Sequence, residues 1–546
     1  MTRTESPVWT VLECRARALL LAAAVGLLLG IAGLLNSCAG ARVTLRGEVD
    51  YWPTDGWLTA EPESVGMDSG TLASMYEFLT RGGHRVDGII LIKEGRIVTE
   101  AYRQPYYSVD RLHNIFSCTK SVTSACVGIA IDQGLLPDVD TPVDDLFPDY
   151  QAGPGYHTGD GPVTLENLLT MTTGLDAQDS YLYNWTGLVE LQASDDWIAH
   201  AFSLPNAEPP GSWFDYSNTS SFLLSAAVGE ASGMSQEEFA AENLFGPLGI
   251  DEWWWRGNPQ GITIGWGDLL LRPRDMAKFG FLYLHGGEWE GQQIIPRRWI
   301  EQSWTRIVAA GSGVLSGYGY QWWTDQDGTY AAVGYHGQYI FINPQLDLVM
   351  VVTSTLPEVL SYVPYSLYSR YALRAVTGTV GSTDPANSAR LNDAVARFEA
   401  GERVSESTAV PNAAPPAARS GWAGIYDLDD RSGGLRSISF EFPSDSDADV
   451  VLGLAIDQDA LLKLDGISFA TTAGGPATII DVDPYTVAAQ TGWNDDGDLV
   501  VFVEMIGISA FSRLVVHFED GAISVEQSNE DHVTFAYGVT RRSSQE

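Results

Sequence analysis

A serine and a lysine three residues apart stand at the head of an apolar segment of this chain. The stretch N-I-F-S-C-T-K-S-V-T-S, residues 114–124, contains Ser117 and Lys120. Residues three apart on a helix share a face, so the lysine amine can reach the serine hydroxyl. The hydroxyl becomes a nucleophile when a base takes its proton, and burial near a helix N-terminus favours a neutral lysine. The pattern predicts a nucleophile with its base; the alternative is a polar surface turn.

The rarity of lysine strengthens this interpretation. The chain has only Lys93, Lys120, Lys278 and Lys463, and only Lys120 follows a serine by three residues. The N–H of Ser117 is the first candidate donor to the oxyanion that forms when the serine attacks a carbonyl.

A second group of polar residues, F-D-Y-S-N at 214–218, follows a Pro/Gly-rich stretch and precedes an expected helix. Tyr216 on such a loop can relay a proton between lysine, serine and leaving group. Asn218 offers an amide to a substrate carbonyl or amide. The alternatives are a half-buried loop tyrosine and an asparagine that caps the helix.

A third element, G-Y-H-G-Q-Y-I-F-I-N-P at 334–344, indicates a turn into an inner strand. Backbone N–H groups at this strand edge, around Ala332, Gly334 and Gly337, are candidates for the second oxyanion donor. His336 is a candidate substrate contact, or else a turn histidine hydrogen-bonded to the backbone. Gly337 is expected where two backbone segments approach closely.

In this order, S-C-T-K, Y-S-N and the glycine-rich strand resemble the serine β-lactamase and penicillin-binding-protein-like superfamily. The likeness is greater to its class C branch of D-aminopeptidase-like, esterase-like and 6-aminohexanoate-dimer-hydrolase-like enzymes. Further stretches that carry it are L-I-K-E-G-R-I-V-T-E (91–100), V-T-L-E-N-L-L-T-M-T-T-G-L (163–175), F-G-P-L-G-I (245–250), R-P-R-D-M-A-K-F-G (272–280) and Y-G-Y-Q-W-W (318–323). The resemblance implies an acylated Ser117, Lys120 as its base, Tyr216 as proton relay, and a site between a sheet and a helical region.

One departure from that family concerns the substrate. The family's K-T-G strand motif, whose lysine helps to bind the substrate carboxylate, is replaced here by T-Y-A-A-V-G, residues 329–334. No lysine or arginine occurs from Ile307 to Ser369, which leaves His336 as the one possible cation there. Since charge-assisted contacts bind carboxylates strongly, an ester or a linear amide is expected in place of a β-lactam or D-Ala-D-Ala peptide. Most of the tryptophans between the second and third motifs are expected in the core, with one or two lining an acyl pocket. They are Trp253, Trp254, Trp255, Trp266, Trp322 and Trp323.

The elements around these motifs predict an α+β fold with an antiparallel sheet flanked by helices, because strand patterns lie at 87–103 and 317–355 and helical patterns between them. We expect a leader at 38–60, a β-lactamase-like domain at 61–380, a linker at 381–419 and a small all-β barrel or sandwich at 420–546, which serves as lid or spacer. Helices are expected over 117–133, 164–175, 219–232, 235–245 and 273–285.

The N-terminus predicts export. Three arginines precede an apolar stretch that ends in L-L-N-S-C, which resembles a bacterial lipobox, with Cys38 as the lipid-attachment residue. An uncleaved anchor helix within 1–37 is the alternative, and on either interpretation the membrane is contacted only there.

Composition narrows the partners further. The net charge of -39 disfavours nucleic acid, and the scattered histidines and four cysteines contain no metal-binding spacing, so no cofactor is expected. The sequence therefore predicts an exported serine hydrolase acting on a small ester or amide. The alternatives are a β-lactamase or D,D-peptidase, an inactive penicillin-binding-like sensor, and a structural surface protein.

Overall fold

The computed structural model of the chain describes residues 51–540 with short interruptions. Not described are residues 1–50, 151–152, 154–155, 159–160, 311–314, 402–409, 417–418, 429–434, 444–448, 457–466, 474–476, 483–484, 507–509, 520–521, 529–532 and 541–546. The predicted signal or anchor at 1–37 and the lipid site at Cys38 lie outside the described residues. Across the described parts, we find no helix with the length and apolarity that crossing a membrane requires.

An eight-stranded antiparallel sheet organises the larger domain, in the order β10-β11-β12-β13-β14-β15-β1-β2. Strand β1 (Val86–Lys93) pairs with β2 (Arg96–Tyr102) on one side and with β15 (Leu348–Ser354) on the other. Early and late segments of the domain thus share one sheet, which confirms the predicted α+β arrangement. The other strands are β10 (Val308–Ala309), β11 (Gly317–Tyr318), β12 (Trp323–Thr324), β13 (Tyr330–Gly334) and β14 (Gln338–Asn343).

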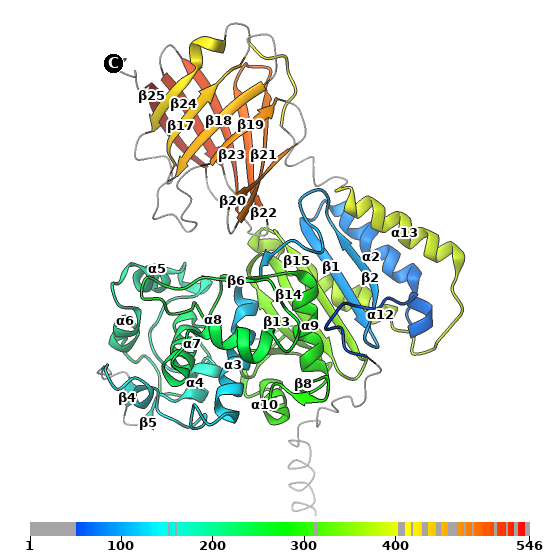
Figure 1. The fold of residues 1–546 in the computed structure, drawn as a ribbon, viewed down its shortest axis with the longest axis vertical. Coiled ribbons are helices and arrows are strands. Elements are labelled where there is room, and N and C mark those ends of the chain that lie inside the picture. The colour runs from blue at the N-terminus through cyan, green and yellow to red at the C-terminus, as the bar shows by residue number, and fades with distance from the viewer. Residues whose placement is uncertain are drawn as a thin grey trace, which may run out of the picture. The chain divides into compact units, whose positions relative to one another are not determined.

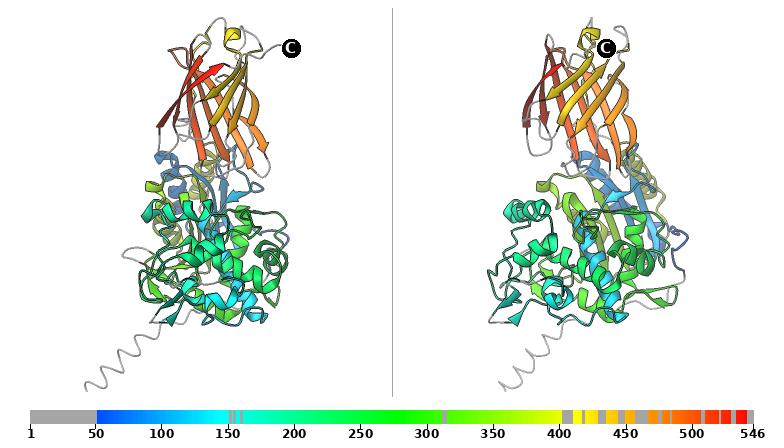
Figure 2. Two further views of the ribbon diagram at one scale, coloured as in Figure 1. Left: turned by 90° about the vertical axis from the view of Figure 1, so that its left-hand side faces the viewer. Right: turned by 60° about the vertical axis from the view of Figure 1, so that its left-hand side comes forward.

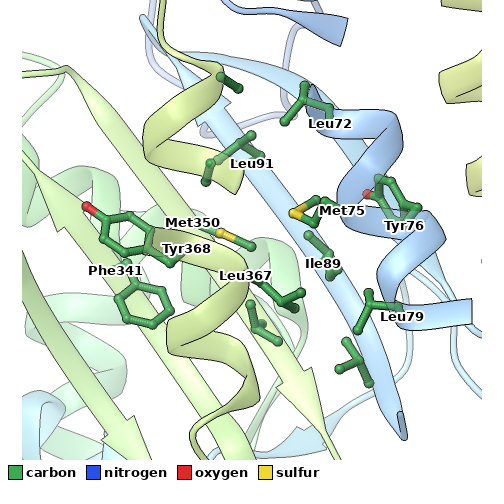
Figure 3. Packing of buried hydrophobic residues seen from close by; sticks show 14 of the residues in the cluster. Leu72, Met75, Tyr76, Leu79, Ile89, Leu91, Phe341, Met350, Leu367 and Tyr368 are labelled. Atoms are coloured by element: carbon green, nitrogen blue, oxygen red, sulfur yellow. The ribbon is translucent and has the colours of Figure 1, made fainter. Parts of the chain in front are cut away.

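Helices cover both faces of this sheet, and every residue of β1 is consequently buried (Figure 1). Helix α2 (Ser69–Gly82) begins where the Asp68 side chain accepts from Thr71 N at 2.7 Å, and it ends at Gly83, whose φ of 61° is left-handed. Figure 3 shows the apolar side of α2 against β1, and the segment of α11 (Val363–Leu367) against the inner strands. The labelled side chains are Leu72, Met75, Tyr76, Leu79, Ile89, Leu91, Phe341, Met350, Leu367 and Tyr368.

Helix α9 (Pro273–Leu284) packs on the opposite face, against β1, β14 and β15. Gly280 allows this approach, because a Cβ there would lie 2.8 Å from Ile340 Cγ2 and 3.0 Å from Val349 Cγ1. The predicted helix over 273–285 is confirmed.

A mainly helical region is inserted between the strands β2 and β10, and its helices gather beside the sheet (Figure 1, Figure 2). It comprises α3 (Thr119–Asp132), α4 (Leu165–Leu169), α5 (Thr186–Ala193), α6 (Trp197–Ser203), α7 (Asn218–Ser232), α8 (Gln236–Ala240) and, after α9, α10 (Arg297–Ser303). Short strand pairs or triples complete it: β3 (His113–Asn114), β6 (Trp254–Trp255) and β7 (Leu269–Leu271), then β4 (His157–Thr158) with β5 (Gly161–Pro162), and β8 (Glu288–Trp289) with β9 (Gln292–Gln293). The helix predicted over 164–175 is too long: it ends at Leu169, and Met171 turns the chain with a φ of 58°.

Part of the predicted linker at 381–419 is a packed helix, which corrects that boundary. Helix α13 (Pro385–Glu399) starts with a capping Asp384 and a proline in its first turn. It lies along α2 (Figure 1), and its buried residues Leu391, Ala394 and Phe398 belong to the core of the larger domain. Short helix α12 (Leu373–Ala375) precedes it.

The C-terminal residues form a ten-stranded antiparallel sheet with its own apolar core. Its terminal strands, β19 and β20, contact each other, so the sheet closes into a barrel (Figure 2). The strands are β16 (Gly424–Leu428), β17 (Leu435–Glu441), β18 (Asp449–Ile456), β19 (Ile467–Thr472), β20 (Thr478–Val482), β21 (Tyr485–Trp493), β22 (Leu499–Ile506), β23 (Ala510–Glu519), β24 (Ala522–Ser528) and β25 (Val533–Thr540).

If α13 belongs to the core of the larger domain, shortening Phe398 should destabilise that domain. Phe398 is 5% exposed and meets the Tyr76 ring edge-on at 5.4 Å. We expect Phe398→Ala to lower the free energy of unfolding by about 3 kcal/mol, measured in urea. Asn392→Ala, on the exposed side of the same helix, is the control and should change it little. Equal effects of the two variants would contradict the packing.

Candidate active site

Ser117 lies in a short 3₁₀ turn, Phe116–Cys118, which leads directly into α3. The turn is anchored just upstream: Ile115 N donates to Leu269 O at 2.9 Å, and the Asn114 side chain accepts from Phe116 N at 2.7 Å. Phe116 has a φ of 45°, in the region that non-glycine residues seldom adopt. The chain therefore turns sharply before the serine, and Ser117 is half-buried at the wall of a cavity.

Buried charges hold the strand that precedes this turn. His113 of β3 contacts Asp87 of β1 at 3.2 Å through Nε2, and Arg103 donates to the same carboxylate at 2.7 Å. Asp87 is fully buried, which favours its neutral form, but Arg103 and His113 hold the pKa of this carboxyl below its usual range. The β3 segment is thereby tied to the main sheet.

The Lys120 amine has three polar neighbours, all of which have acceptor oxygens. Nζ lies 3.0 Å from Ser117 Oγ, 2.7 Å from Asn218 Oδ1 and 3.1 Å from Trp266 O. Asn218 begins α7, and Trp266 lies on the loop before β7. The structure therefore brings the predicted nucleophile and base into hydrogen-bond contact.

This set of neighbours orients the amine. A neutral amine has two N–H donors and one lone pair. Asn218 Oδ1 and Trp266 O only accept, so they take the two protons and leave the lone pair facing the Ser117 hydroxyl. After proton transfer, the three protons of the ammonium match the three acceptors, so the same site suits both forms.

Burial supplies the neutral form. The Lys120 side chain is fully buried, and loss of hydration lowers its pKa to about 7, against the opposing effect of Asp179. A substantial part of the amine is therefore neutral near pH 7.

Tyr216 lies beside this pair on the loop before α7. Its ring centroid is 4.8 Å from Lys120 Nζ, and it stacks on Trp323 at 6.0 Å with an interplanar angle of 25°. Tyr216 and Ser117 line the same cavity. The half-buried position of Tyr216 fits an ordinary loop tyrosine as well, so its role as a proton relay stays a prediction.

Asn218 does not cap its helix, because Ser217 is the N-cap and accepts from Ser220 N at 3.1 Å. Asn218 is buried, with Oδ1 on Lys120 and Nδ2 donating to Asp179 O at 2.7 Å. Its contact with a substrate stays a prediction; the contacts it makes within the protein orient Lys120.

The end of β13 forms another wall of the cavity. Strand β12 pairs with β13 only at Tyr330 and Ala331, and Val333, Gly334 and Tyr335 line the cavity. A Cβ on Gly334 would lie 2.4 Å from Ile115 O, so glycine permits this strand to approach the turn that contains Ser117. The assignment of an oxyanion donor among Ala332, Gly334 and Gly337 stays a prediction.

The turn after β13 has a structural role. His336 Nδ1 lies 2.8 Å from Leu356 O, and His336 is absent from the cavity lining, so the backbone-bonded alternative describes it better than a substrate contact. Gly337 has a φ of 90°, and a Cβ there would lie 2.4 Å from Ser354 Oγ. Glycine is needed at 337 because of this φ and the nearby side chains of Ser354, Leu356 and Pro364, so the predicted close approach of two backbone segments is not what the structure has there.

The cavity has a volume of about 810 Å³ and a largely aromatic lining. Trp323 lines this cavity, in line with the expectation that one or two of the six tryptophans would do so. Trp322 is fully buried in the core. The sequence reasoning missed the remaining aromatic and acidic lining, which comes from the segment between α4 and α5, the loop before α7, the turn before β14, β14 itself and the turn after β15. These residues are Tyr183, Trp185, Trp213, Phe214, Asp215, Tyr335, Tyr339 and Glu358.

The described residues contain no group of three or more His, Cys, Asp or Glu placed to hold a metal ion. Cys118 and Cys126 are free and buried, and burial raises the pKa of both thiols.

Sequence comparison gives the family. The model of the beta-lactamase family matches residues 73–367. A 6-aminohexanoate-dimer hydrolase from Paenarthrobacter ureafaciens is 25% identical over 297 residues, which cover 50% of this chain and 73% of that protein. The monacolin J acid methylbutanoyltransferase of Aspergillus terreus is 29% identical over 171 residues, 28% of this chain and 40% of that protein.

Solved structures align with the chain at lower identity. A putative 6-aminohexanoate-dimer hydrolase from Bacillus anthracis has 22% identity and a TM-score of 0.48, with 62% of this chain and 91% of that chain covered. An octameric penicillin-binding protein homologue from Pyrococcus abyssi has 17% identity and a TM-score of 0.47, with 86% and 100% covered.

The lowered pKa of Lys120 predicts how reactivity depends on pH. Below about pH 7 the amine is charged and has no lone pair for the Ser117 proton, so labelling by a fluorophosphonate should rise with pH through a midpoint near 7. The rate is read by intact-mass spectrometry. Lys120→Arg stays charged and should label very slowly at every pH. A rate in the parent that is independent of pH from 5 to 9 would contradict Lys120 as the base.

Proposed function

The chain belongs to the β-lactamase family, and from that premise we propose that it is a serine hydrolase that forms a covalent acyl-enzyme with an ester or linear amide. The observation that supports this most is the Lys120 amine, buried and 3.0 Å from Ser117 Oγ with its other contacts on acceptors.

Acylation begins when Ser117 Oγ attacks the substrate's carbonyl carbon while its proton passes to Lys120 Nζ. The carbonyl oxygen becomes an oxyanion, for which the Ser117 N–H and the β13 edge are the proposed donors. The ammonium formed on Lys120 is held by Asn218 Oδ1 and Trp266 O. The ring of Tyr216, 4.8 Å from Nζ, adds a favourable cation–π contact.

Collapse of the intermediate breaks the bond to the leaving group. In our proposal the leaving oxygen or nitrogen takes a proton from the Tyr216 hydroxyl, which is restored from Lys120. Water then attacks the carbonyl carbon of the acyl-enzyme while one of its protons passes to Lys120 Nζ. Collapse of this intermediate breaks the bond between the acyl group and Ser117 Oγ, Lys120 returns the proton to Oγ, and the acid product leaves.

The cavity favours an uncharged or cationic acyl group over an anionic one. None of the described residues that line it is a lysine or arginine, and two are the carboxylates Asp215 and Glu358. The aromatic lining offers contacts to apolar and cationic groups. This supports an ester or linear amide and disfavours β-lactams and D,D-peptides, whose carboxylate would meet no lysine or arginine among the described lining residues. The names of the two sequence relatives, a dimer hydrolase and an acyltransferase, fit acyl chemistry.

Removal of the nucleophile tests the proposal. We expect Ser117→Ala to lower kcat on p-nitrophenyl esters by at least about a thousandfold while leaving the unfolding temperature within a few degrees of the parent. The panel includes a chromogenic cephalosporin and a linear amide dimer, each assayed with both proteins. Ester turnover by a folded Ser117→Ala protein would contradict the mechanism, and a preference for the cephalosporin would favour a β-lactamase.

The charge of the cavity gives a separate prediction. A p-nitrophenyl ester whose acyl chain ends in a carboxylate should have a lower kcat/KM than the neutral ester of equal length. The ratio of kcat/KM for the neutral ester to kcat/KM for the carboxylate ester measures this preference. Asp215→Asn removes one repelling charge and should lower that ratio roughly tenfold. Glu208→Gln, exposed and outside the lining, is the control. An unchanged ratio in Asp215→Asn would show that this carboxylate does not select the substrate.

A further inference from the structure

A buried carboxylate that the mechanism above does not use lies next to the catalytic residues. Asp179 is 1% exposed, on the segment between α4 and α5. Its Oδ2 accepts from Thr219 N at 2.5 Å and from Ser217 Oγ at 3.3 Å, both at the start of α7. Its Oδ1 is buried and has no hydrogen-bond partner among the described residues.

The backbone of the same residue fixes the Asn218 amide. Asp179 O accepts from Asn218 Nδ2 at 2.7 Å, which turns Oδ1 toward Lys120 Nζ, also at 2.7 Å. A continuous path of hydrogen bonds therefore runs from Ser117 through Lys120 and Asn218 to Asp179.

We propose that Asp179 is a positioning and charge-balancing residue for Lys120: its backbone carbonyl holds the Asn218 amide, and the charge of its side chain stabilises the ammonium form of the lysine. The inference rests on the proposed function, in which Lys120 takes the proton of Ser117. That transfer creates an ammonium ion on a side chain that is 1% exposed, where a nearby buried anion stabilises it strongly. Asp179 supplies this anion without touching the substrate.

Capping of α7 does not account for a charged residue at this position. Ser217 already caps the helix, and Thr219 N needs only an acceptor oxygen, which a neutral side chain also provides. Burial of the carboxylate raises the pKa of Asp179, while the bonds from α7 and the charge of Lys120 oppose that rise. A carboxyl buried at this cost, where a neutral acceptor would serve Thr219 N equally well, points to a role beyond the cap.

Other titratable groups around the two residues are few. On the side of Lys120 they are Cys118, in the turn before its helix, and Tyr216. On the side of Asp179 they are Asp215 and Tyr183, whose pKa values are both raised in part by the Asp179 charge. None of these four carries a positive charge, and Asp215 is the other carboxyl of the group, so Lys120 is its one cationic side chain.

The four lysines of the chain make a direct test possible. Protein labelled with ¹³Cε-lysine gives few resonances, and the one that disappears in Lys120→Ala identifies Lys120. In the parent its shift should titrate near pH 7. In Asp179→Asn, the midpoint should fall by about one pH unit or more, because the anion that favours the ammonium is gone. Asp176→Asn, an exposed carboxylate on the same segment, is the matched control and should leave the midpoint unchanged.

Activity gives the second readout. With the ester that the parent hydrolyses, Asp179→Asn should lower kcat roughly tenfold or more with little change in KM. The pH at which kcat falls to half on the acid side should move to lower pH, by the same amount as the titration midpoint of Lys120. If Asp179→Asn unfolds, Asp179→Ser, which keeps an acceptor for Thr219 N, replaces it. An unchanged Lys120 midpoint in the folded variant overturns the inference. The NMR titration needs no turnover, so this outcome is distinct from a failure of the hydrolase proposal.

Discussion

The chemistry of this site depends on one desolvated amine held between three oxygens. Lys120 Nζ meets a hydroxyl, a side-chain amide and a backbone carbonyl, and it lies over the face of the Tyr216 ring. Removal from water lowers the pKa, and the two obligatory acceptors direct the lone pair. Burial alone would give a neutral amine whose lone pair has no fixed orientation. Acceptor oxygens alone would favour the charged ammonium form.

The surrounding fold keeps these oxygens in place. Gln321, with a φ of 62°, accepts from Ser121 Oγ of α3 and from Ser221 Oγ of α7, both at 2.8 Å, and donates to Leu169 O at 2.9 Å. Thr123 Oγ1 donates to Gly265 O at 2.8 Å, beside Trp266. A Cβ on Gly265 would lie 2.2 Å from Ser221 O, so glycine lets this loop reach the α3–α7 contact. Side-chain hydrogen bonds from α3 and α7 to Gln321 and Gly265 thus fix the surroundings of Lys120.

The sequence allowed the local part of this site to be predicted and left the rest undetermined. Ser117 and Lys120 lie within one helical turn, so their contact follows from spacing. The partners Asn218 and Trp266 lie 98 and 146 residues from Lys120, and only packing selects them. Asp179 carries no local pattern, since its significance comes from burial.

The fold could be predicted in outline for similar reasons. Strand patterns at both ends of the larger domain indicated one shared sheet, which the structure has. The alanine- and proline-rich composition near α13 concealed a helix, although Asp384 before Pro385 and apolar residues at 391, 394 and 398 follow helical rules. The periodicity of apolar residues is therefore a better indicator of structure in this segment than its composition.

The central claim is that Ser117 carries the acyl group during turnover. The most direct measurement is peptide mapping by mass spectrometry of the parent protein, quenched in acid while it hydrolyses an excess of p-nitrophenyl ester. The account predicts the mass of the acyl group on the peptide that contains Ser117, and none on that peptide in Lys120→Ala. Steady turnover with no acyl group at Ser117, or with the group on another residue, would contradict it.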